Sequence, residues 1–393
     1  MRPTAIALPI GSVILVASLI VTARYGPGGG DETLAPSPTT VENPAGVRVD
    51  TASPAATPDR AYDPALRALP GRVYDPVWAG EQIPEGFRHA LPRDEILPIY
   101  DPVFLPAEEV SWSDDMLVIG LEIDGDARAY PVIFLDIREM VIDRVAGIPV
   151  VVTWCPLCGT AMVHRRELDG QEILFGIQGA LYRNAMTWWD HDTGSVWSQP
   201  LGEAILGPRT GATVERLASE LTTWGAWREA YPDTWALETP EWVLETPGPY
   251  ARIGLDDIVV VVEFAGEAVT FAIEDLREVG VANEVVAGTP IAVVSDPRDE
   301  RRWSVLLRTL DDQTVTLAVV GDSLIDLETA SVWDPARGIA LKGALRGSIL
   351  HRLPGFTAFA KDVPRFWPNA RVWEPVPVPP NPDWDRGLVP VQV

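Results

Sequence analysis

The chain has 393 residues, enough for more than one folded unit, and its net charge is −25, from 56 acidic and 31 basic residues. So acidic a chain is poorly suited to bind nucleic acid or anionic lipid through charge, and we expect no nucleic-acid partner. The charge identifies no protein partner either.

The first predicted element is an uncharged apolar run over residues 5–23, between Arg2 and Arg24. A run of this length crosses a bilayer core of roughly 30 Å at about 1.5 Å per residue. Its last residues, 21–23, also fit the small-residue cleavage site of a signal peptide. Residues 1–25 are therefore predicted to be a single membrane anchor with an extracytoplasmic domain, or a signal peptide whose removal gives a secreted protein.

Residues 26–64 are rich in Pro, Thr, Ala and Gly, and residues 375–393 form a Pro-rich tail. Neither segment has a periodic apolar pattern, so we expect a disordered tether and an extended tail. The part between them is rich in Val, Ile, Leu and Trp. At about 300 residues it is long enough for two packed units.

Two parts of this region read alike, in the same order and at similar spacing. Residues 129–138, 145–149 and 150–153 resemble residues 270–277, 286–290 and 291–294, and Thr193-Gly-Ser-Val-Trp197 resembles Thr329-Ala-Ser-Val-Trp333. We predict a β-rich α+β fold in two tandem copies of one unit, residues 65–245 and residues 246–374.

The elements of the first copy are predicted from apolar periodicity and turn residues. In chain order they are strands at 117–123 and 127–132, a helix at 135–143, a buried strand at 150–154, and strands at 161–166, 173–177 and 185–189. A helix after Thr222 places Trp224, Trp227 and Tyr231 on one face. Phe356 and Phe359 are expected to lie on a similar helix of the second copy.

The two cysteines, Cys155 and Cys158, lie three positions apart in Trp154-Cys-Pro-Leu-Cys158. The second copy aligns as Ser295-Asp-Pro-Arg-Asp299, which keeps the proline and lacks both thiols. The shared fold therefore does not require the thiols, which points to chemistry specific to the first copy.

Three uses of the pair compete. A structural disulfide closes too short a loop to stabilise the fold much. A thiol–disulfide exchange site is possible, although the residues after Cys158 read as a turn and strand rather than the helix of thioredoxin-like proteins. The third use is metal binding, because a turn with Cys-x-x-Cys is a common half-site.

Metal binding is the leading prediction, with Cu(I) preferred over zinc because two thiolates suffice for Cu(I). A tetrahedral zinc site needs further ligands, and the candidates are His164, His191 and Asp190, with Met162 and Met186 after them. The alternatives are a thiol–disulfide oxidoreductase and a ligand-binding or scaffold module without enzymatic activity.

Polar residues Tyr182, Arg183 and Asn184 are predicted to line the same site and to orient a ligand. The sequence has no nucleophile elbow, phosphate loop, dinucleotide fingerprint or zinc-protease motif, so hydrolytic and nucleotide-dependent enzymes have no support. Whether the protein is an enzyme at all is left open by these motifs.

The first copy resembles the family called domain of unknown function 3179 over roughly residues 96–237. The resemblance rests on Asp126-Ala-Arg-Ala-Tyr-Pro131, Val152-Thr-Trp-Cys-Pro-Leu-Cys-Gly-Thr160, Gly179-Ala-Leu-Tyr182, Ser195-Val-Trp-Ser-Gln199, Gly202-Glu-Ala204, Gly207-Pro208 and Thr222-Thr-Trp224. It implies an architecture but no reaction.

One departure from the family pattern concerns the residues before the cysteine strand. The resemblance implies His-Glu at this place, followed by Asn-Asp, and this chain has Arg138-Glu139 and then Ile142-Asp143. Arg138 cannot coordinate a metal, but beside a thiol it would lower the thiol's pKa. We expect Arg138 and Glu139 to line the site.

Overall fold

The computed structural model describes residues 81–245 and 258–375, together with residues 41–42 and 48–49. The predicted anchor or signal segment at 1–25 lies outside the described residues, as do most of the tether and nearly all of the tail. Among the residues described, no helix combines the length and apolarity needed to span a membrane. Strands β1 (Val41–Glu42) and β2 (Arg48–Val49) pair with each other, and they belong to a separate unit of the chain.

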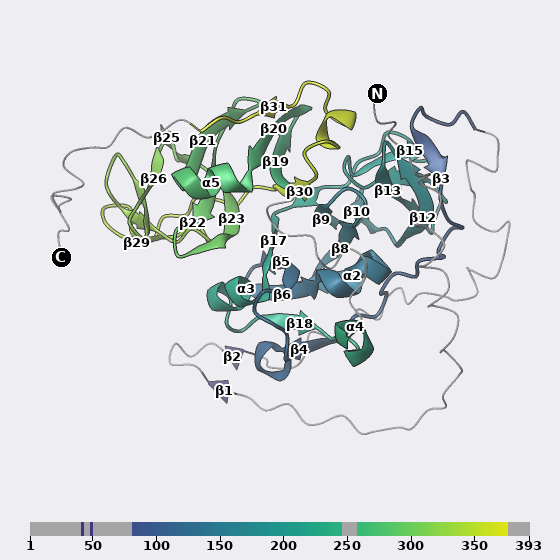
Figure 1. Ribbon diagram of the computed structural model, residues 1–393, viewed down its shortest axis with the longest axis horizontal. Coiled ribbons are helices and arrows are strands. Elements are labelled where there is room, and N and C mark those ends of the chain that lie inside the picture. The colour runs from purple at the N-terminus through teal and green to yellow at the C-terminus, as the bar shows by residue number, and fades with distance from the viewer. Residues whose placement is uncertain (1–40, 43–47, 50–80, 246–257, 376–393) are drawn as a thin grey trace, which may run out of the picture. The chain divides into compact units, whose positions relative to one another are not determined.

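Both repeats lie within the second unit, and Figure 1 shows the first in blue to teal and the second in green to yellow. The first contains β3 Phe87–His89, β4 Phe104–Pro106, η3 Ala107–Glu109, β5 Leu117–Ile123, β6 Asp126–Pro131, α2 Val132–Arg138, β7 Met140–Val145, β8 Ile148–Cys155, β9 Thr160–Arg165, β10 Glu167–Leu168, β11 Gln171–Glu172, β12 Phe175–Tyr182, β13 Ala185–Asp190, β14 Val196–Ser198, β15 Glu203–Leu206, β16 Arg216–Leu217, β17 Ser219–Thr223, α3 Trp224–Ala230, β18 Trp235–Leu237 and α4 Glu241–Glu245.

The second repeat follows the same order of elements. It contains β19 Val259–Phe264, β20 Glu267–Ala272, α5 Ile273–Val279, β21 Val281–Val286, β22 Thr289–Asp296, β23 Asp299–Leu307, β24 Thr309–Leu310, β25 Gln313–Thr314, β26 Leu317–Val320, β27 Ser323–Asp326, β28 Val332–Trp333, β29 Ala340–Lys342, β30 Phe356–Ala358, η5 Val363–Arg365 and β31 Arg371–Val372.

The sheets of the two repeats have matching topology. The outer sheet has the order β17-β5-β6-β18-β4 in the first repeat and β30-β19-β20-β31 in the second, with a parallel pairing of β18 to β6 and of β31 to β20. A central sheet, β7-β8-β9 or β21-β22-β23, and a third sheet, β12 to β15 or β26 to β29, also recur. The chain is therefore β-rich with two tandem copies of one unit, as predicted.

Several predicted elements are found where the sequence placed them. Strands β5, β6, β8, β9 and β13 match the predicted strands within two residues, and α3 follows Thr223. The predicted aromatic face of α3 is buried, and Trp227 packs so closely on β5 that a Cβ at Gly120 would lie 2.3 Å from its ring. Only glycine fits at that contact.

Two predicted helices are wrong. The helix expected at 135–143 ends at Arg138, because Glu139 takes the left-handed conformation with φ 56° and Met140 begins strand β7. The β-branched residues of β7 pair with β8, and this sheet pairing outweighs helical periodicity. Phe356 and Phe359 do not lie on a helix, since Phe356 begins strand β30, which pairs with β19.

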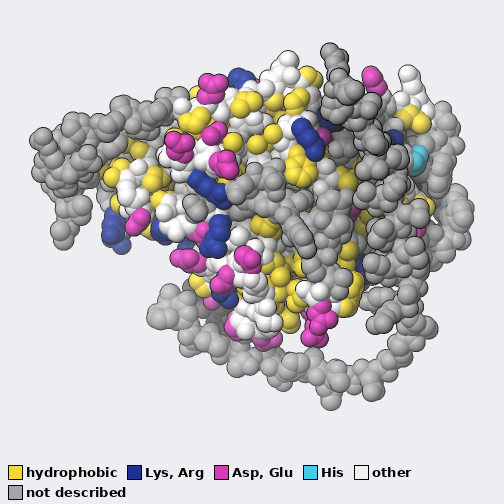
Figure 2. All heavy atoms as spheres, viewed as in Figure 1, with side chains coloured by type: hydrophobic (Ala, Val, Ile, Leu, Met, Phe, Trp, Pro, Cys, Tyr) yellow, Lys and Arg dark blue, Asp and Glu magenta, His cyan; other side chains and the backbone are white. Residues whose placement is uncertain are grey.

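Apolar side chains of both repeats share one buried cluster, which includes Trp154, Val260 and Trp303. Polar contacts join the repeats as well: Arg302 donates to Glu220 at 2.8 Å, and the Trp303 indole donates to the carbonyl of Leu221 at 3.1 Å. The face in Figure 2 carries acidic and basic side chains interspersed with apolar ones, so the negative charge of the chain forms no single patch on this face.

Candidate dithiol site

Cys155 and Cys158 lie at the turn that joins strands β8 and β9. Cys155 is the last residue of β8, and the Cys158 amide donates to the Cys155 carbonyl at 3.3 Å. The side chains are 1% and 2% exposed and are not joined by a disulfide, while Leu157 between them is 40% exposed. The turn therefore has an accessible tip and holds its sulfur atoms inside.

The Cys158 thiol donates to the Cys155 carbonyl at 3.9 Å. The pKa of Cys155 responds to hydrogen bonding by the Cys158 side chain and by the backbone of Met186, Cys158 and Leu157. Burial by itself raises the pKa of Cys155, but these hydrogen bonds outweigh it and lower the pKa below the ordinary cysteine value. The site thus makes the Cys155 thiol more acidic than an ordinary cysteine.

Cys158 has the opposite character. Burial, its hydrogen bond to Cys155 and the nearby charges of Cys155 and Asp362 raise its pKa well above the ordinary value, against the effect of the Thr160 hydroxyl, which donates to its sulfur at 3.0 Å. The pair is therefore asymmetric, with Cys155 more acidic and Cys158 less acidic than an ordinary cysteine.

Two acidic side chains lie on the α2 side of the pair. Burial, then the charges of Cys155 and Asp136, raise the pKa of Glu139 to about 8. Burial raises the pKa of Asp136 to about 7, although its Oδ1 accepts a hydrogen bond from the Trp154 indole at 2.8 Å. The Glu139 carbonyl accepts a hydrogen bond at 2.9 Å from the amide of Trp154, the residue before Cys155, and the placement of its carboxyl in the site stays a prediction.

Gln199 supports the turn from the third sheet. Its buried amide nitrogen donates to the Thr153 hydroxyl at 3.0 Å and to the Thr160 carbonyl at 3.3 Å. Sequence reasoning did not assign a site role to Gln199 or Thr160. Gln199 is the last residue of the motif Ser195-Val-Trp-Ser-Gln199, and this motif could have identified Gln199 as a site residue.

The second repeat covers the turn from the other side. The Thr357 hydroxyl donates to the Gly159 carbonyl at 3.0 Å, and the Phe359 amide donates to the Cys158 carbonyl at 2.8 Å. A cavity of about 10 Å³, room for about one water molecule, lies between Cys158 and Asp362. No pattern within the first copy could have predicted these contacts.

Asp362 is the charged residue of this cavity and is 3% exposed. Its Oδ1 accepts hydrogen bonds from Arg365 Nε at 2.9 Å and from Asn184 Nδ2 at 3.4 Å. Its Oδ2 accepts no hydrogen bond within the described residues, and Lys361 Nζ lies 3.8 Å from it.

The remaining polar residues predicted to line the site lie at the hairpin turn between β12 and β13, where Asn184 donates to Asp362 of the cavity. Arg183 and Asn184 both have positive φ, 51° and 77°, and make the two-residue hairpin turn between β12 and β13. Arg183 donates to the Arg365 carbonyl at 3.0 Å, and the ring of Tyr182 packs edge-on against Phe366. These three residues hold the second repeat in place.

Arg138 contacts Leu97 and Phe134. Its guanidinium donates to the Leu97 carbonyl at 3.3 Å and lies 6.0 Å from the ring of Phe134. The groups that set the pKa of Cys155 are the amides and the Cys158 thiol described above.

Asp190 has a role in the fold of both repeats. Its carboxylate accepts hydrogen bonds from the Thr193 amide at 2.7 Å and from the Trp197 indole at 2.9 Å. In the second repeat Asp326 accepts the same bonds from Thr329 and Trp333, at 2.6 and 3.0 Å. Because the thiol-free repeat keeps this network, the network serves the turn rather than the dithiol.

His164 lies away from the Cys155 sulfur along strand β9. Cys155 pairs with Thr160, and His164 is four residues further along β9, roughly 13 Å away at about 3.3 Å per residue. Burial, and then Arg216, lower the pKa of His164 well below its ordinary value. His191 stacks on Trp189 with ring centroids 4.1 Å apart, and burial lowers its pKa to about 4.

No predicted ligand therefore joins the two thiols. Over residues 81–245 and 258–375, no three His, Cys, Asp or Glu side chains converge as a metal site. Of the two methionines considered, Met186 contributes its backbone amide to Cys155, and Met162 pairs with Thr153 in the sheet.

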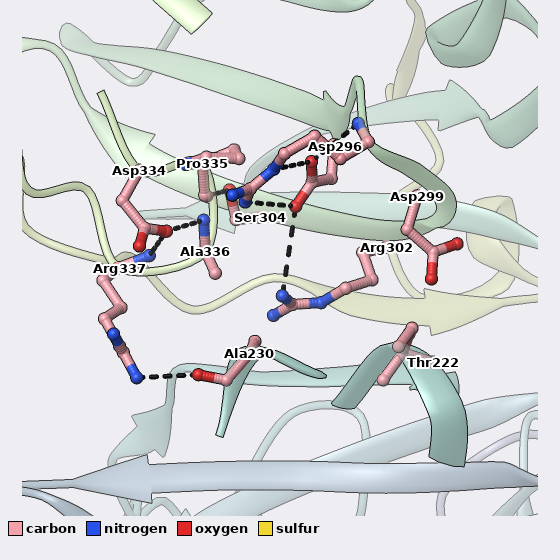
Figure 3. Close-up of polar contacts among 12 residues, drawn as sticks. Thr222, Ala230, Asp296, Asp299, Arg302, Ser304, Asp334, Pro335, Ala336 and Arg337 are labelled. Atoms are coloured by element: carbon pink, nitrogen blue, oxygen red, sulfur yellow. Dashed lines mark hydrogen bonds and ion pairs between the residues drawn. The ribbon is translucent and has the colours of Figure 1, made fainter. Parts of the chain in front are cut away.

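The second repeat has ion pairs where the first has thiols. Asp296 ends β22 as Cys155 ends β8, and Figure 3 shows it between Arg302 and the other residues of the turn. Arg298 binds its carboxylate at 3.0 Å and Arg302 approaches to 4.0 Å, while Asp299 pairs with Arg301 at 2.7 Å. The same hairpin thus carries charge pairs in one copy and a dithiol in the other.

Comparison with known proteins gives one family. The model of the family described as "Protein of unknown function (DUF3179)" matches twice, over residues 93–254 and over residues 242–370. No match was found among curated proteins or among solved structures. Each match coincides with one of the two structural repeats.

Proposed function

This chain belongs to the DUF3179 family of proteins of unknown function, and we propose that its first repeat is a thiol–disulfide redox centre. Cys155 is the attacking thiolate and Cys158 is the resolving thiol. The second repeat, which lacks thiols, is a cover for the site and not a second centre.

The observation that carries this proposal is the pair of free, buried thiols in one turn, where the Cys158 thiol donates to the Cys155 carbonyl at 3.9 Å and the Thr160 hydroxyl donates to the Cys158 sulfur at 3.0 Å. Hydrogen bonding lowers the pKa of Cys155 in this turn. A thiolate, not a thiol, is the nucleophile in disulfide exchange, so a buried cysteine needs such donors to react at neutral pH. Donors that stabilise the reduced form also make the disulfide more oxidising.

The exchange proceeds in two balanced steps. The Cys155 thiolate attacks one sulfur of a disulfide, the substrate's S–S bond breaks, and one substrate thiolate leaves. Cys158 then loses its proton and attacks the Cys155 sulfur, forming the Cys155–Cys158 disulfide and releasing the second substrate thiolate. Two electrons pass from the dithiol to the substrate, which ends as two thiols.

Binding of Cu(I) or zinc by the same two sulfurs stays a prediction from the sequence. The redox function has more support than zinc binding because, among the described residues, no third His, Cys, Asp or Glu side chain converges with the two thiols as a tetrahedral site needs. We further propose that the redox centre works outside the cytoplasm, supported by the uncharged apolar run at residues 5–23.

A redox titration tests the proposal. Full-length protein is equilibrated with mixtures of reduced and oxidised glutathione and then alkylated. Mass spectrometry measures the fraction of protein with alkylated thiols. We expect a reversible two-electron transition at a potential between about −270 and −120 mV, toward the oxidising end. The matched control, Cys155→Ser/Cys158→Ser, should show none.

Two results would overturn the redox function. One is a dithiol that stays reduced at every glutathione ratio. The other is copper or zinc that copurifies with the wild type in stoichiometric amount and is lost from the double variant, since that result assigns the thiols to metal.

A further inference from the structure

Each repeat covers the hairpin turn of the other with an equivalent segment. The Thr357 hydroxyl donates to the Gly159 carbonyl in the dithiol turn, and the Thr222 hydroxyl donates to the Arg301 carbonyl in the thiol-free turn, both at 3.0 Å. The segments that begin at these two threonines align, as Thr222-Thr-Trp-Gly-Ala-Trp227 and Thr357-Ala-Phe-Ala-Lys-Asp362. The two covering segments can therefore be compared residue by residue.

The segment that covers the dithiol turn carries charges that the other covering segment lacks. Over the thiol-free turn, Ala226 and Trp227 lie on α3 and are 0% exposed. The aligned residues over the dithiol turn are Lys361, whose side chain is 70% exposed, and Asp362, which is buried. Apolar residues at these positions satisfy the shared fold. The charges are thus specific to the segment that covers the thiols.

Lys361 is held close to the dithiol turn by Phe359. The Phe359 amide donates to the Cys158 carbonyl at 2.8 Å, and a Cβ at Gly159 would lie 3.3 Å from the Phe359 ring. The Lys361 ammonium lies 4.7 Å from the centre of the same ring. Leu157, between the two cysteines, is 40% exposed. A molecule that approaches the tip of the turn therefore meets an apolar side chain and, across the Phe359 ring, a cation.

Two arginines extend the positive charge around this turn. Arg365, whose side chain is 52% exposed, donates to the Asp362 carboxylate at 2.9 Å. Arg183 of the first repeat donates to the Arg365 carbonyl at 3.0 Å. We call Arg183, Lys361 and Arg365 the basic rim. Its three cations share these contacts with one carboxylate, so positive charge is in excess here, although the net charge of the chain is −25.

We propose that the basic rim is a docking surface for an acidic segment of a partner protein, which presents its disulfide to the dithiol turn. This inference rests on the proposed redox function and adds the substrate class to it, a disulfide flanked by Asp or Glu. The exchange itself is the two-step reaction given above.

The charges of the chain direct such a segment to this turn. Carboxylates of the segment pair with the basic rim, and an apolar side chain beside its disulfide packs on Leu157. Opposite charges on two surfaces speed their encounter and orient it. The acidic remainder of the chain repels the same segment, so the rim determines where the segment binds.

The test uses three peptide disulfides that differ only in charge. Each joins two identical peptides in which the cysteine follows a leucine and is flanked by Glu, by Gln or by Lys. The rate at which each disulfide oxidises the reduced full-length protein is measured by alkylation and mass spectrometry. The wild type should react with the Glu peptide about threefold or more faster than with the Lys peptide. This preference should disappear between about 0.01 M and 1 M salt, because the Debye length falls from about 30 to 3 Å.

Substitutions of the two lysines assign the preference to the rim. Lys361→Glu should remove or reverse the preference for the Glu peptide, and Lys361→Arg, which keeps the charge, should keep the preference. The matched control is Lys342→Glu, which makes the same charge change at the other lysine of the chain, an exposed residue at the end of β29. This control should behave as the wild type. Urea denaturation verifies that each variant is folded.

The outcomes are distinct. Equal rates with the three peptides, or an equal loss of preference in Lys342→Glu and Lys361→Glu, would overturn the docking surface and leave the redox function standing. Oxidised glutathione is a small dianion, and if it reacts as fast as the Glu peptide, a protein segment is the wrong occupant. A wild-type protein that none of these disulfides oxidises would overturn the redox function itself.

Discussion

Cys155 and Asp296 are the last residues of the equivalent strands β8 and β22, so one hairpin position holds a thiol in the first repeat and a carboxylate in the second. Around Cys155 the chain places amide donors, and around Asp296 it places arginines. The shared fold tolerates either group. The chemistry of the site is therefore an addition to the fold and is not required by it.

Removing the Asp190 carboxylate should destabilise the protein without affecting the dithiol. Asp190→Ala leaves the buried Trp197 indole without its acceptor, and Asp326→Ala does the same to Trp333. We expect each variant to lose about 3 kcal/mol of unfolding free energy, measured by urea denaturation. If Asp190→Ala also shifts the dithiol equilibrium and Asp326→Ala does not, Asp190 belongs to the site.

The ion pair between Glu220 and Arg302 should stabilise the packing of the two repeats against each other. Both side chains are buried and 2.8 Å apart, so removing Arg302 leaves Glu220 without this partner, and removing Glu220 leaves Arg302 with only the more distant Asp296 at 4.0 Å. Glu220→Leu or Arg302→Met alone should cost about 3–5 kcal/mol, and the double variant much less than the sum of the two. Additive losses in a double-mutant cycle would show that the pair does not couple the repeats.

Asp136 should make the fold less stable as pH rises. Its pKa rises from 3.8 to about 7 on folding, so it favours the folded state below its unfolded pKa, and this contribution is lost as pH rises through the folded pKa. The loss is roughly 4 kcal/mol at about 1.4 kcal/mol per pKa unit.

The substitution Asp136→Asn should remove this dependence. The free energy of unfolding of the variant minus that of the wild type should therefore increase from about pH 4 to pH 7. The exposed Asp233→Asn is the matched control, and its difference from wild type should stay flat over the same range. A flat difference for Asp136→Asn would show that Asp136 is ionised in the folded protein.

Neutralising Asp362 should speed the resolving step. Its charge helps to raise the pKa of Cys158, so Asp362→Asn should lower that pKa and increase the resolving thiolate at a given pH. We expect closure of a Cys155 mixed disulfide to become faster by up to about tenfold, because one pKa unit is a tenfold change in thiolate. The exposed Asp312→Asn should have no effect, and an unchanged rate in Asp362→Asn would contradict the role of the second repeat.

The sequence predicted the repeats and most strands because their signals are local. Apolar alternation marks β5 and β6, and the β-branched run of β8 marks a buried strand. The end of α2 was missed because it depends on pairing between β7 and β8, which lie on one sheet only in the folded chain. Phe356 was misplaced for the same reason, since its partner strand β19 lies far away in sequence.

The site was predicted in part. The two cysteines were identified from their spacing and lie in one turn, and Glu139, identified from resemblance, bonds through its carbonyl to Trp154, the residue before Cys155. His164 and His191 were proposed from residue type alone. The local sequence does not predict the distance of His164 from Cys155 along β9, or the stacking of His191 on Trp189. Asp362 belongs to the second repeat, so only the packing of the two repeats brings it to Cys158.

The most direct test of the redox centre is to trap its first intermediate. Cys158→Ser and Cys155→Ser proteins are treated with hydroxyethyl disulfide near neutral pH, and the mixed disulfide is measured by mass spectrometry. The proposed asymmetry predicts rapid modification of Cys155 in Cys158→Ser, even though that variant loses one of the donors, and little modification of Cys158 in Cys155→Ser. Equal rates at the two sulfurs, or no mixed disulfide on Cys155, would contradict the assignment of Cys155 as the attacking thiolate.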